Sequence, residues 1–406
     1  MTTDIRVLDS EGDLVAAANV FRTAMIGFPR LAELETTQIT RLLEHGRTIG
    51  AFVDNQLVGT ADAQTSTLTL PGGARVGHAA VTHIGVLPSF TRRGIATELV
   101  HHQLRDVAAR GEPVATLRAS EATIYERYGY GVASTSQTVE VQTARAALRP
   151  GAATGGPVRL LDSAQVWDVL PLIYAGNRPS RPGAIDRPDV WWRNVRLRTE
   201  SGSGPWYVAV HGTPGSETGF ARYRPIDTDK WFVSDQRTIV VEDFFAPDID
   251  SYLGLMRFLL GLDLIDRVVF WMLPVDDPLP WLLVDQRAMK VTTTHDETWL
   301  RIVDVEKTLA ARQYADSNAD VAIAVDDPLL PDNSTTLAVS AAGAQRSDRR
   351  PQVHVGVAGL AAVLLGGATW HNLSMAGLAR ADDPAHLAAA DRLFETDQAP
   401  HAGIFF

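Results

Sequence analysis

One segment of this 406-residue chain, VTHIGVLPSFTRRGIATE at positions 81–98, constrains its fold more than any other. An apolar run ending at Leu87 precedes a proline, and a basic turn ending at Gly94 precedes a run of helix-forming residues. This order predicts a strand, a tight turn and the start of a helix. Such a turn directs free backbone N–H groups and the positive end of a helix dipole at one point, and Arg92 and Arg93 add charge. The segment therefore predicts an anion-binding turn that suits a pyrophosphate.

Two common phosphate-binding motifs are absent from this segment. The Walker pattern requires Gly-Lys-Ser/Thr after four free positions, and the dinucleotide-binding fingerprint requires three spaced glycines. Judged on Arg92, Arg93 and Gly94 alone, the plain alternative of an arginine-rich surface turn without a ligand stays open.

The composition describes a globular protein whose chemistry does not use cysteine. The chain is 45% hydrophobic and 21% charged, as in ordinary soluble domains, and its length suffices for about three domains. It contains no cysteine, which excludes disulfides, thiolate metal ligands and a cysteine acyl intermediate.

Charge and hydropathy narrow the partners that we expect. The net charge of −11 argues against nucleic acid and favours cationic substrates such as amines. The N-terminal MTTDIRVLDSEGD lacks the apolar stretch of a signal peptide, and the longest apolar run, 355–368, is too short to span a bilayer. These features predict a cytoplasmic protein that binds neither nucleic acid nor membrane.

Strand and helix patterns divide the chain into three blocks. Residues 1–143 alternate between the two patterns, which predicts a mixed α/β sheet, and a short helix is expected at 121–128 after Ser120. The small, glycine-rich segment ARAALRPGAATGGP at 144–157 predicts a linker.

The second block, 158–294, repeats the element order of the first without the basic turn. After VVEDFFAPD its helix opens on Asp248, an acidic start that would repel phosphate. The third block, 295–406, begins with an alternating strand and predicts an α+β domain with an apolar helix, VAGLAAVLLGG, and a further helix at 373–380.

The basic turn resembles the acyl-CoA loop of the GCN5-related N-acetyltransferases. Their pattern is Val-x-Pro at the end of a strand, then Arg/Gln-x-x-Gly-x-Gly/Ala at the start of a helix. Val86, Pro88, Gly94 and Ala96 fit this pattern, whereas Thr91 stands where Arg or Gln is usual. Because main-chain N–H groups do much of the phosphate binding, the resemblance tolerates this departure.

The order of the three blocks resembles one family of these enzymes, the Eis-type (enhanced intracellular survival) acetyltransferases. The segments RASEATIYERYGYG (118–131), DPLPWLL (277–283) and WLRIVDV (299–305) match the family, as does a C-terminal Phe. The resemblance implies tandem GCN5-related acetyltransferase folds followed by a sterol-carrier-protein-like α+β domain. The domains implied are catalytic at 1–143, degenerate at 158–294 and sterol-carrier-like at 295–406, and the assembly implied is a homohexamer.

The resemblance also implies a reaction, a co-substrate and a set of site residues. Acetyl-CoA would give its acetyl group directly, without a metal, to a primary amine of an aminoglycoside-like polyamine or of a protein lysine. Tyr125 would be the general acid that protonates the CoA thiolate, and the carboxylate of Phe406 the general base. The residues implied to bind acetyl-CoA are Thr82, His83, Ile84, Val86, Arg92, Arg93, Gly94, Ile95 and Ala96.

Departures from the family pattern concern the amine site. His83 stands where an aromatic residue is usual, and we expect it to line the pocket rather than to act as a base. Arg118 stands where His is usual, and its charge is expected to repel a polyamine. Phe21 and Met25 are candidate pocket walls that fit a core helix equally well.

Two other functions stay open on the sequence. The apolar run at 360–365 fits a lipid or small-molecule binding protein whose acetyltransferase fold is vestigial, although a core helix explains the run equally. The other is a transferase that uses a longer acyl-CoA.

Overall fold

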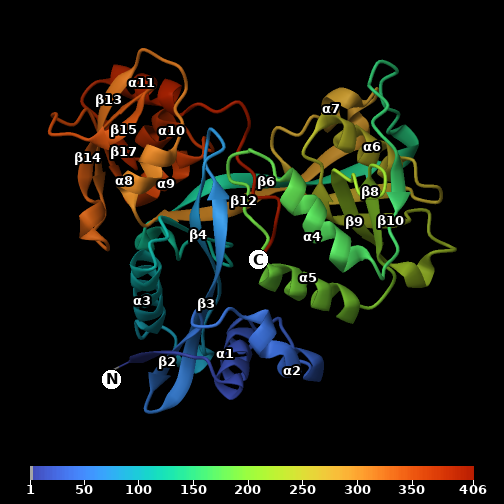
Figure 1. Cartoon of the computed structure of the whole chain (residues 1–406), viewed down its shortest axis with the longest axis horizontal. Coiled ribbons are helices and arrows are strands. Elements are labelled where there is room, and N and C mark those ends of the chain that lie inside the picture. The colour runs from blue at the N-terminus through green and yellow to red at the C-terminus, as the bar shows by residue number, and fades with distance from the viewer. Residues whose placement is uncertain (1–2) are drawn as a thin grey trace.

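The computed structural model describes residues 3–406, which form three consecutive units and one linking strand (Figure 1). The first unit comprises β1 (Asp4–Val7), α1 (Glu11–Ala24), α2 (Glu33–Leu42), β2 (Ile49–Val53), β3 (Gln56–Thr69), β4 (Arg75–Val86), α3 (Ile95–Ala109), β5 (Val114–Leu117) and β6 (Tyr130–Gln142). The second comprises β7 (Val158–Leu160), α4 (Val166–Asn177), α5 (Asp189–Ser201), β8 (Tyr207–His211), β9 (Gly219–Pro225), β10 (Thr238–Phe245), α6 (Ile249–Leu260), β11 (Arg267–Pro274) and α7 (Leu279–Leu282). The linking strand is β12 (Met289–Ile302). The third unit comprises α8 (Val305–Ala311), β13 (Asp320–Asp326), β14 (Thr335–Ser340), β15 (Gly343–Arg346), β16 (Val353–Gly356), α9 (Val357–Leu364), α10 (Trp370–Met375), β17 (Ala379–Ala381) and α11 (Pro384–Phe394).

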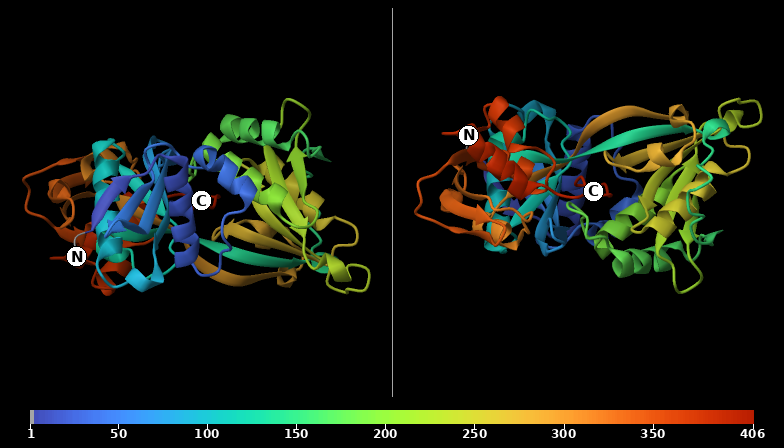
Figure 2. Two further views of the ribbon diagram at one scale, coloured as in Figure 1. Left: turned by 90° about the horizontal axis from the view of Figure 1, so that it is seen from below. Right: turned by 90° about the horizontal axis from the view of Figure 1, so that it is seen from above.

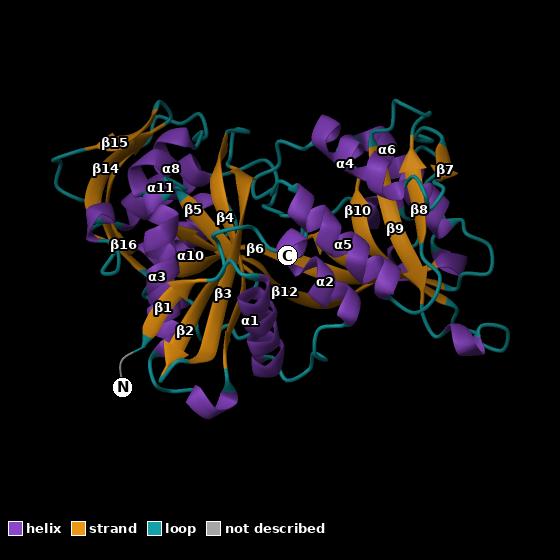
Figure 3. Cartoon of the chain, turned by 60° about the horizontal axis from the view of Figure 1, so that its bottom comes forward, coloured by secondary structure: helices purple, strands orange, loops and turns teal. Residues whose placement is uncertain are grey.

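Two β-sheets organise these elements (Figure 3). The larger has twelve strands in the order β1-β2-β3-β4-β5-β12-β6-β11-β10-β9-β8-β7, and the smaller has five in the order β15-β14-β13-β16-β17. The first and second units therefore share one continuous sheet. The sequence suggested that the strand after residue 295 opens the third domain, but β12 lies between β5 and β6. The three domain bounds stay a prediction, with residues 295–302 in the large sheet.

Two helices expected from the sequence differ in the structure. Residues 121–128 form turns and one 3-10 turn at Glu126–Tyr128, which ends at Gly129 in a left-handed conformation (φ 84°) before β6. Residues 373–380 are not one helix either. The helix α10 stops after Met375, Gly377 has a positive φ of 76°, and the chain then enters β17. Within 373–380 a glycine therefore ends helical structure earlier than the apolar pattern suggests.

The third unit is anchored to the large sheet by an apolar helix and a buried ion pair. Residues 360–365 are buried, and α9 packs so closely on β6 that a Cβ at Gly131 would lie 2.1 Å from the carbonyl oxygen of Ala358. Nearby, Arg301 of β12 pairs with Asp327 at 2.8 Å. The apolar run that suggested a lipid site therefore takes part in core packing. No helix within residues 3–406 has both the length and the apolar character needed to cross a membrane.

We expect Gly131→Ala to lower the melting temperature, because the added methyl group must displace the backbone of α9. Overpacking of this kind costs about 1–3 kcal/mol. Gly12→Ala in α1 is the matched control, since a Cβ at Gly12 meets nothing within 4 Å and alanine favours a helix. Thermal unfolding followed by circular dichroism tests this, and equal melting temperatures of the two variants would contradict the close packing.

Candidate functional site

The strands β4 and β5 pair over three residues and then separate. His78–Ala80 run parallel to Val114–Thr116, while the other edge of β5 pairs with β12 over Val114–Leu117. On its other edge, β4 stays paired with β3 as far as Val86. Beyond Ala80, the edge of β4 that faced β5 is therefore available to an extended ligand, and Thr82, His83, Ile84 and Val86 lie on this part of the strand.

A β-bulge lies at the point of separation. Thr60 of β3 pairs with Gly85, but Asp62 pairs with Thr82, so two residues of β4 face one residue of β3. His83 lies in this bulge with a positive φ of 51°. Its ring packs edge-on against Phe21 of α1 at 4.8 Å, which places one of the two candidate wall residues beside it.

The basic turn has the geometry that its sequence predicts. It follows β4 through a 3-10 turn at Pro88–Phe90 and ends at Gly94, which caps α3 with a φ of 84°. Arg92 also has a positive φ of 61°, and alternation of this kind directs successive N–H groups to one side. A Cβ on Gly94 would meet nothing within 4 Å, so the space before the helix is open.

The remaining residues of the turn divide between core and surface. The side chain of Ile95 is buried beside Leu99, so its contribution to a ligand would be its backbone N–H, as for Ala96. Arg92 and Arg93 are exposed, and Arg93 also donates to the Ser89 carbonyl at 3.0 Å. The open helix start and the arginines fit a pyrophosphate.

Tyr125 lies in the apolar core that faces the separated part of β4. It is 6% exposed and shares a cluster with Val81 and Ile84. Burial raises the pKa of its phenol. The hydroxyl of Tyr128 bonds to Thr97 of α3 at 3.0 Å, so Tyr128 is the one of the two tyrosines that ties this turn to the helix.

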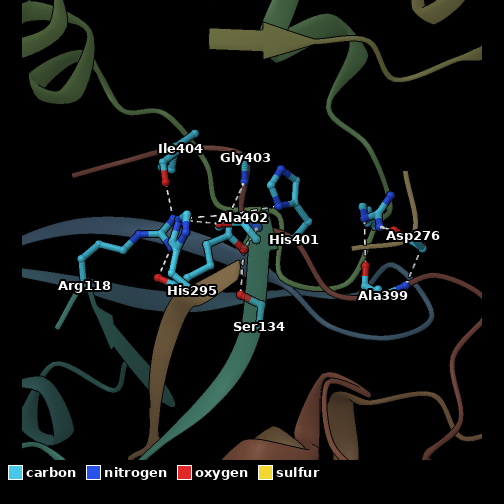
Figure 4. Close-up of polar contacts among 12 residues, drawn as sticks. Arg118, Ser134, Asp276, His295, Ala399, His401, Ala402, Gly403 and Ile404 are labelled. Carbon is cyan, nitrogen blue, oxygen red and sulfur yellow. Dashed lines mark hydrogen bonds and ion pairs between the residues drawn. The ribbon is translucent and has the colours of Figure 1, made fainter. Parts of the chain in front are cut away.

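The C-terminal tail, residues 399–406, lies between the first and second units (Figure 2). Side chains of other elements hold its backbone in place residue by residue. The carboxylate of Glu297 accepts the N–H groups of Ala402 and Gly403 at 3.0 and 3.2 Å (Figure 4). Further contacts of the tail backbone are Asp276 with the Ala399 N–H, Arg181 with the Ala399 carbonyl, Arg187 with the Gly403 carbonyl, Arg118 with the Ile404 carbonyl and Trp191 with the Phe405 carbonyl.

We call these contacts between side chains and the backbone of residues 399–406 the tail clamp, and Glu297 lies at its centre. It is 1% exposed, accepts a hydrogen bond from Ser134 at 2.8 Å, and lies 3.1 Å from His401 Nδ1 and 3.6 Å from Arg118. Burial alone would raise the pKa of Glu297, but His401, Arg118 and the tail hydrogen bonds together hold it well below its ordinary value. The carboxylate is therefore ionised at neutral pH.

Arg118 does not present a free charge to the site. Its guanidinium pairs with Glu297 and donates to the backbone carbonyls of Glu297 and Ile404. The repulsion of a polyamine that the sequence suggested is thus offset by a neighbouring carboxylate.

The tail brings Phe406 to the base of the separation between β4 and β5. The Phe406 ring packs 6.4 Å from His78 of β4 and 5.7 Å from the Arg118 guanidinium. His78 bonds to Thr116 of β5 at 2.6 Å, and burial lowers its pKa to about 3, so it is neutral here. The last residue of the third unit thus contacts the first unit beside the candidate acetyl-CoA strand.

A pocket of about 710 Å³ borders the tail on its other side. It lies between α5 and strands β9–β11, with Trp191, Trp271 and Phe405 among its walls. The second unit also repeats the strand separation, since β10 and β11 pair only from Thr238 to Val241 and β10 then has a bulge. The helix that follows starts at Asp248 rather than at a basic turn, as the sequence predicts.

The sequence does not indicate three residues that the structure brings forward as functional candidates, namely Glu297, Arg187 and Asp62. Glu297 and Arg187 act on a tail more than a hundred residues away, and Asp62 stands in an alternating strand that reads as ordinary sheet. A buried charged residue gives no local pattern until its partner is known.

Replacing Glu297 by alanine should release the tail, because two buried N–H groups and Arg118 lose their acceptor. Breaking a buried pair in this way costs about 3–5 kcal/mol. We expect faster removal of the last residues by carboxypeptidase, followed by mass spectrometry. Glu306→Ala, which removes an exposed carboxylate paired with Arg346, is the control and should be cleaved at the wild-type rate. The pKa of Glu297 is lower in the folded protein than in the unfolded chain. Its contribution to the free energy of unfolding is therefore present above the unfolded pKa of about 4.3 and is lost as the pH falls. A tail that stays protected in Glu297→Ala would contradict the clamp.

Comparison with known proteins agrees with this geometry. Residues 4–133 and 183–302 each match an acetyltransferase (GNAT) domain, and residues 305–403 match a sterol carrier protein domain. The uncharacterized N-acetyltransferase SCO2625 of Streptomyces coelicolor is 34% identical over 419 aligned residues, which cover 98% of both chains. N-acetyltransferase Eis of Mycobacterium tuberculosis is 34% identical over 273 residues, 66% of this chain and 65% of that protein.

Similar solved structures support the same family and fold. Eis1 from Mycobacterium abscessus is 48% identical with a TM-score of 0.92, over the full length of both chains. A GCN5-related N-acetyltransferase from Anabaena variabilis, 19% identical with a TM-score of 0.85, supports the fold alone. The predicted fold class is therefore confirmed. The chain belongs to the Eis-like N-acetyltransferases, enzymes with two GNAT domains followed by a sterol carrier protein domain.

Proposed function

We propose that this acetyltransferase moves the acetyl group of acetyl-CoA directly to a primary amine, with Tyr125 as general acid and the carboxylate of Phe406 as general base. The observation that carries the proposal is the order of three parts along strand β4. The clamped chain end lies beside His78, β4 then separates from β5, and the strand leads to the open helix start at Gly94.

Acetyl-CoA fits the first two of these features. The pyrophosphate would bind the N–H groups from Arg92 to Ala96 and the nearby guanidinium groups. The amide-bearing pantetheine arm would pair with the free edge of β4 between Thr82 and Val86, as a further strand does. This arrangement directs the thioester toward the bulge, where the apolar core around Tyr125 begins.

The reaction requires one base and one acid, and we assign these roles to the Phe406 carboxylate and the Tyr125 hydroxyl. An alkyl ammonium, with a pKa near 10.4, has no lone pair and must lose a proton before it attacks the thioester carbonyl. The Phe406 carboxylate would bind that ammonium and accept its proton. As the C–S bond breaks, the sulfur receives the bonding electrons and takes a proton from Tyr125, which burial keeps protonated. Proximity supplies much of the rate, since no covalent enzyme intermediate is needed.

The charge of the protein supports amine substrates with several positive charges. Its net charge of −11 attracts cations, and Glu297 neutralises Arg118 beside the chain end. Aminoglycoside-like polyamines are our first choice, and protein lysines our second. By family resemblance we also propose a cytoplasmic homohexamer.

We expect Tyr125→Phe to lower kcat by about 10²–10⁴-fold, the usual contribution of a general acid, with little change in KM for acetyl-CoA. The measurement is thiol release from acetyl-CoA with a panel of aminoglycosides, diamines and lysine peptides. Tyr207→Phe, which changes an exposed tyrosine of the second unit, should keep wild-type turnover. Equal turnover by wild type and Tyr125→Phe would remove the acid assignment.

Two glycines added after Phe406 should reduce kcat strongly, because they move the terminal carboxylate while leaving every side chain in place. The same two glycines placed before Met1 serve as the control. Acetyl-CoA binding measured by calorimetry should not change in either protein. An extended protein with normal turnover would show that the chain end is not the base.

A further inference from the structure

We propose that His83, held by the buried carboxylate of Asp62, is a further catalytic residue that accepts the proton of the substrate ammonium. The inference rests on the proposed function and deepens it, since it assigns a second base to the same amine site.

The contact between the two residues fixes the imidazole. His83 Nδ1 lies 3.4 Å from Asp62 Oδ2, and the other carboxylate oxygen accepts the hydroxyl of Thr48 at 3.0 Å. Asp62 is 1% exposed, and a buried carboxylate requires donors to both oxygens. The side chain of Thr48 supplies one donor, so His83 supplies the other through Nδ1–H. The neutral ring then carries its lone pair on Nε2.

The surrounding backbone holds this dyad in place. The bulge sets His83 at a φ of 51°, a conformation uncommon outside glycine that concentrates at functional sites. Behind it, the amide of Gln103 on α3 donates to the backbone carbonyl of Asp62 at 3.0 Å. The edge of Phe21 packs on the ring from α1. The imidazole thus contacts β3 and α1, and α3 holds the backbone of its partner Asp62.

The ring extends from a buried partner toward open space. The side chain of His83 is 36% exposed, whereas that of Asp62 is 1% exposed. His83 also lies on the part of β4 that has separated from β5, where the acetyl-CoA arm is proposed. Nε2 is therefore the accessible nitrogen of a base beside the expected thioester.

The charged groups around the ring leave Asp62 as its partner. On α1, which packs on the same face, Arg22 is paired with Glu35 of α2 and donates to the Pro29 carbonyl at 3.0 Å. From α3 the neighbouring polar group is the neutral amide of Gln103, and from β3 it is the carboxylate of Asp62. The arrangement is that of an aspartate that orients a histidine base.

A second base resolves a mismatch in the proposed mechanism. An ordinary C-terminal carboxyl has a pKa of about 3.3–3.7, roughly seven units below an alkyl ammonium, whereas imidazoles titrate about three units closer. In our scheme the Phe406 carboxylate holds the ammonium and accepts its proton first, and the proton then passes to His83 Nε2, directly or through one water. The amine lone pair forms the C–N bond, the C–S bond breaks, and Tyr125 protonates the sulfur. The nitrogen loses a second proton as it becomes an amide, and this proton restores Tyr125, while His83 releases the first proton to solvent.

The test is the pH dependence of kcat/KM with a primary amine at saturating acetyl-CoA. Wild type should lose activity as the pH falls, because a protonated base has no lone pair to accept the ammonium proton. His83→Phe, which keeps a ring against Phe21, should lose about 100-fold or more in kcat and lose this acidic limb, with KM for acetyl-CoA within threefold. Asp62→Asn should lose at least tenfold. His45→Ala, which breaks an exposed histidine–aspartate pair with Asp9, is the matched control and should keep the wild-type profile.

Two further readouts separate catalysis from structure. Free imidazole should restore activity to His83→Ala but not to Tyr125→Phe, since it replaces a missing base and not a missing acid. Nitrogen NMR of the wild type at pH 8 should show the Nδ1–H tautomer of His83, and Asp62→Asn should lose that preference.

The outcomes are distinguishable. A wild-type acidic limb that persists in His83→Phe, with kcat within threefold, overturns the base role even though the acetyltransferase function stands. An Nε2–H tautomer at His83 overturns it whatever the activity. A wild type that releases no thiol with any amine of the panel overturns the proposed function, and the NMR result then decides only whether the dyad forms.

Discussion

The pairing of β12 between β5 and β6 is the constraint on which the rest of the structure depends. This one strand carries Glu297, which clamps the tail, Trp299, which packs against Tyr125, and Arg301, whose ion pair anchors the third unit. The three lie at intervals of two residues, and register shifts in the β12–β6 ladder between Asp296 and Trp299 set where Glu297 lies relative to the other two. A shift of register by one residue would turn all three away from their partners. The sheet therefore sets the position of the tail, the acid and the third unit together.

Buried ion pairs supply the specificity that apolar packing lacks. Arg187 forms a bidentate pair with Asp243 and also holds the Gly403 carbonyl, while Glu297 pairs with Arg118 and holds two tail N–H groups. Pairs of this kind add little net stability, because desolvation offsets their attraction, but breaking one is costly. Each pair has one arrangement that satisfies its hydrogen bonds. We infer that they fix where the chain end lies rather than how firmly the domains fold.

The sequence was most informative where the signal is local. The turn at 86–96, the order of elements and the acidic start of α6 are set by neighbouring residues, and the structure contains all three. The position of β12 could not be predicted, because a strand pattern does not name its partners. For the same reason neither Glu297 nor Asp62 stood out. Both act through tertiary contacts, one with a tail and one with a histidine that the sequence suggested only as a pocket wall.

The two GNAT units show that strand separation alone does not make an acetyl-CoA site. Each unit has a parallel pair that parts after a few residues, with a bulge in the neighbouring ladder. They differ in charge at the helix start, where the first has Arg92, Arg93 and an open Gly94, and the second has the carboxylate of Asp248 bound to its own helix. In the second unit the bulged strand β10 carries Asp243, which binds an arginine that holds the tail, whereas in the first the bulged strand β4 carries His83, which binds Asp62 of β3. A separated strand with a bulge thus positions the chain end in the second unit and, on our proposal, a base in the first.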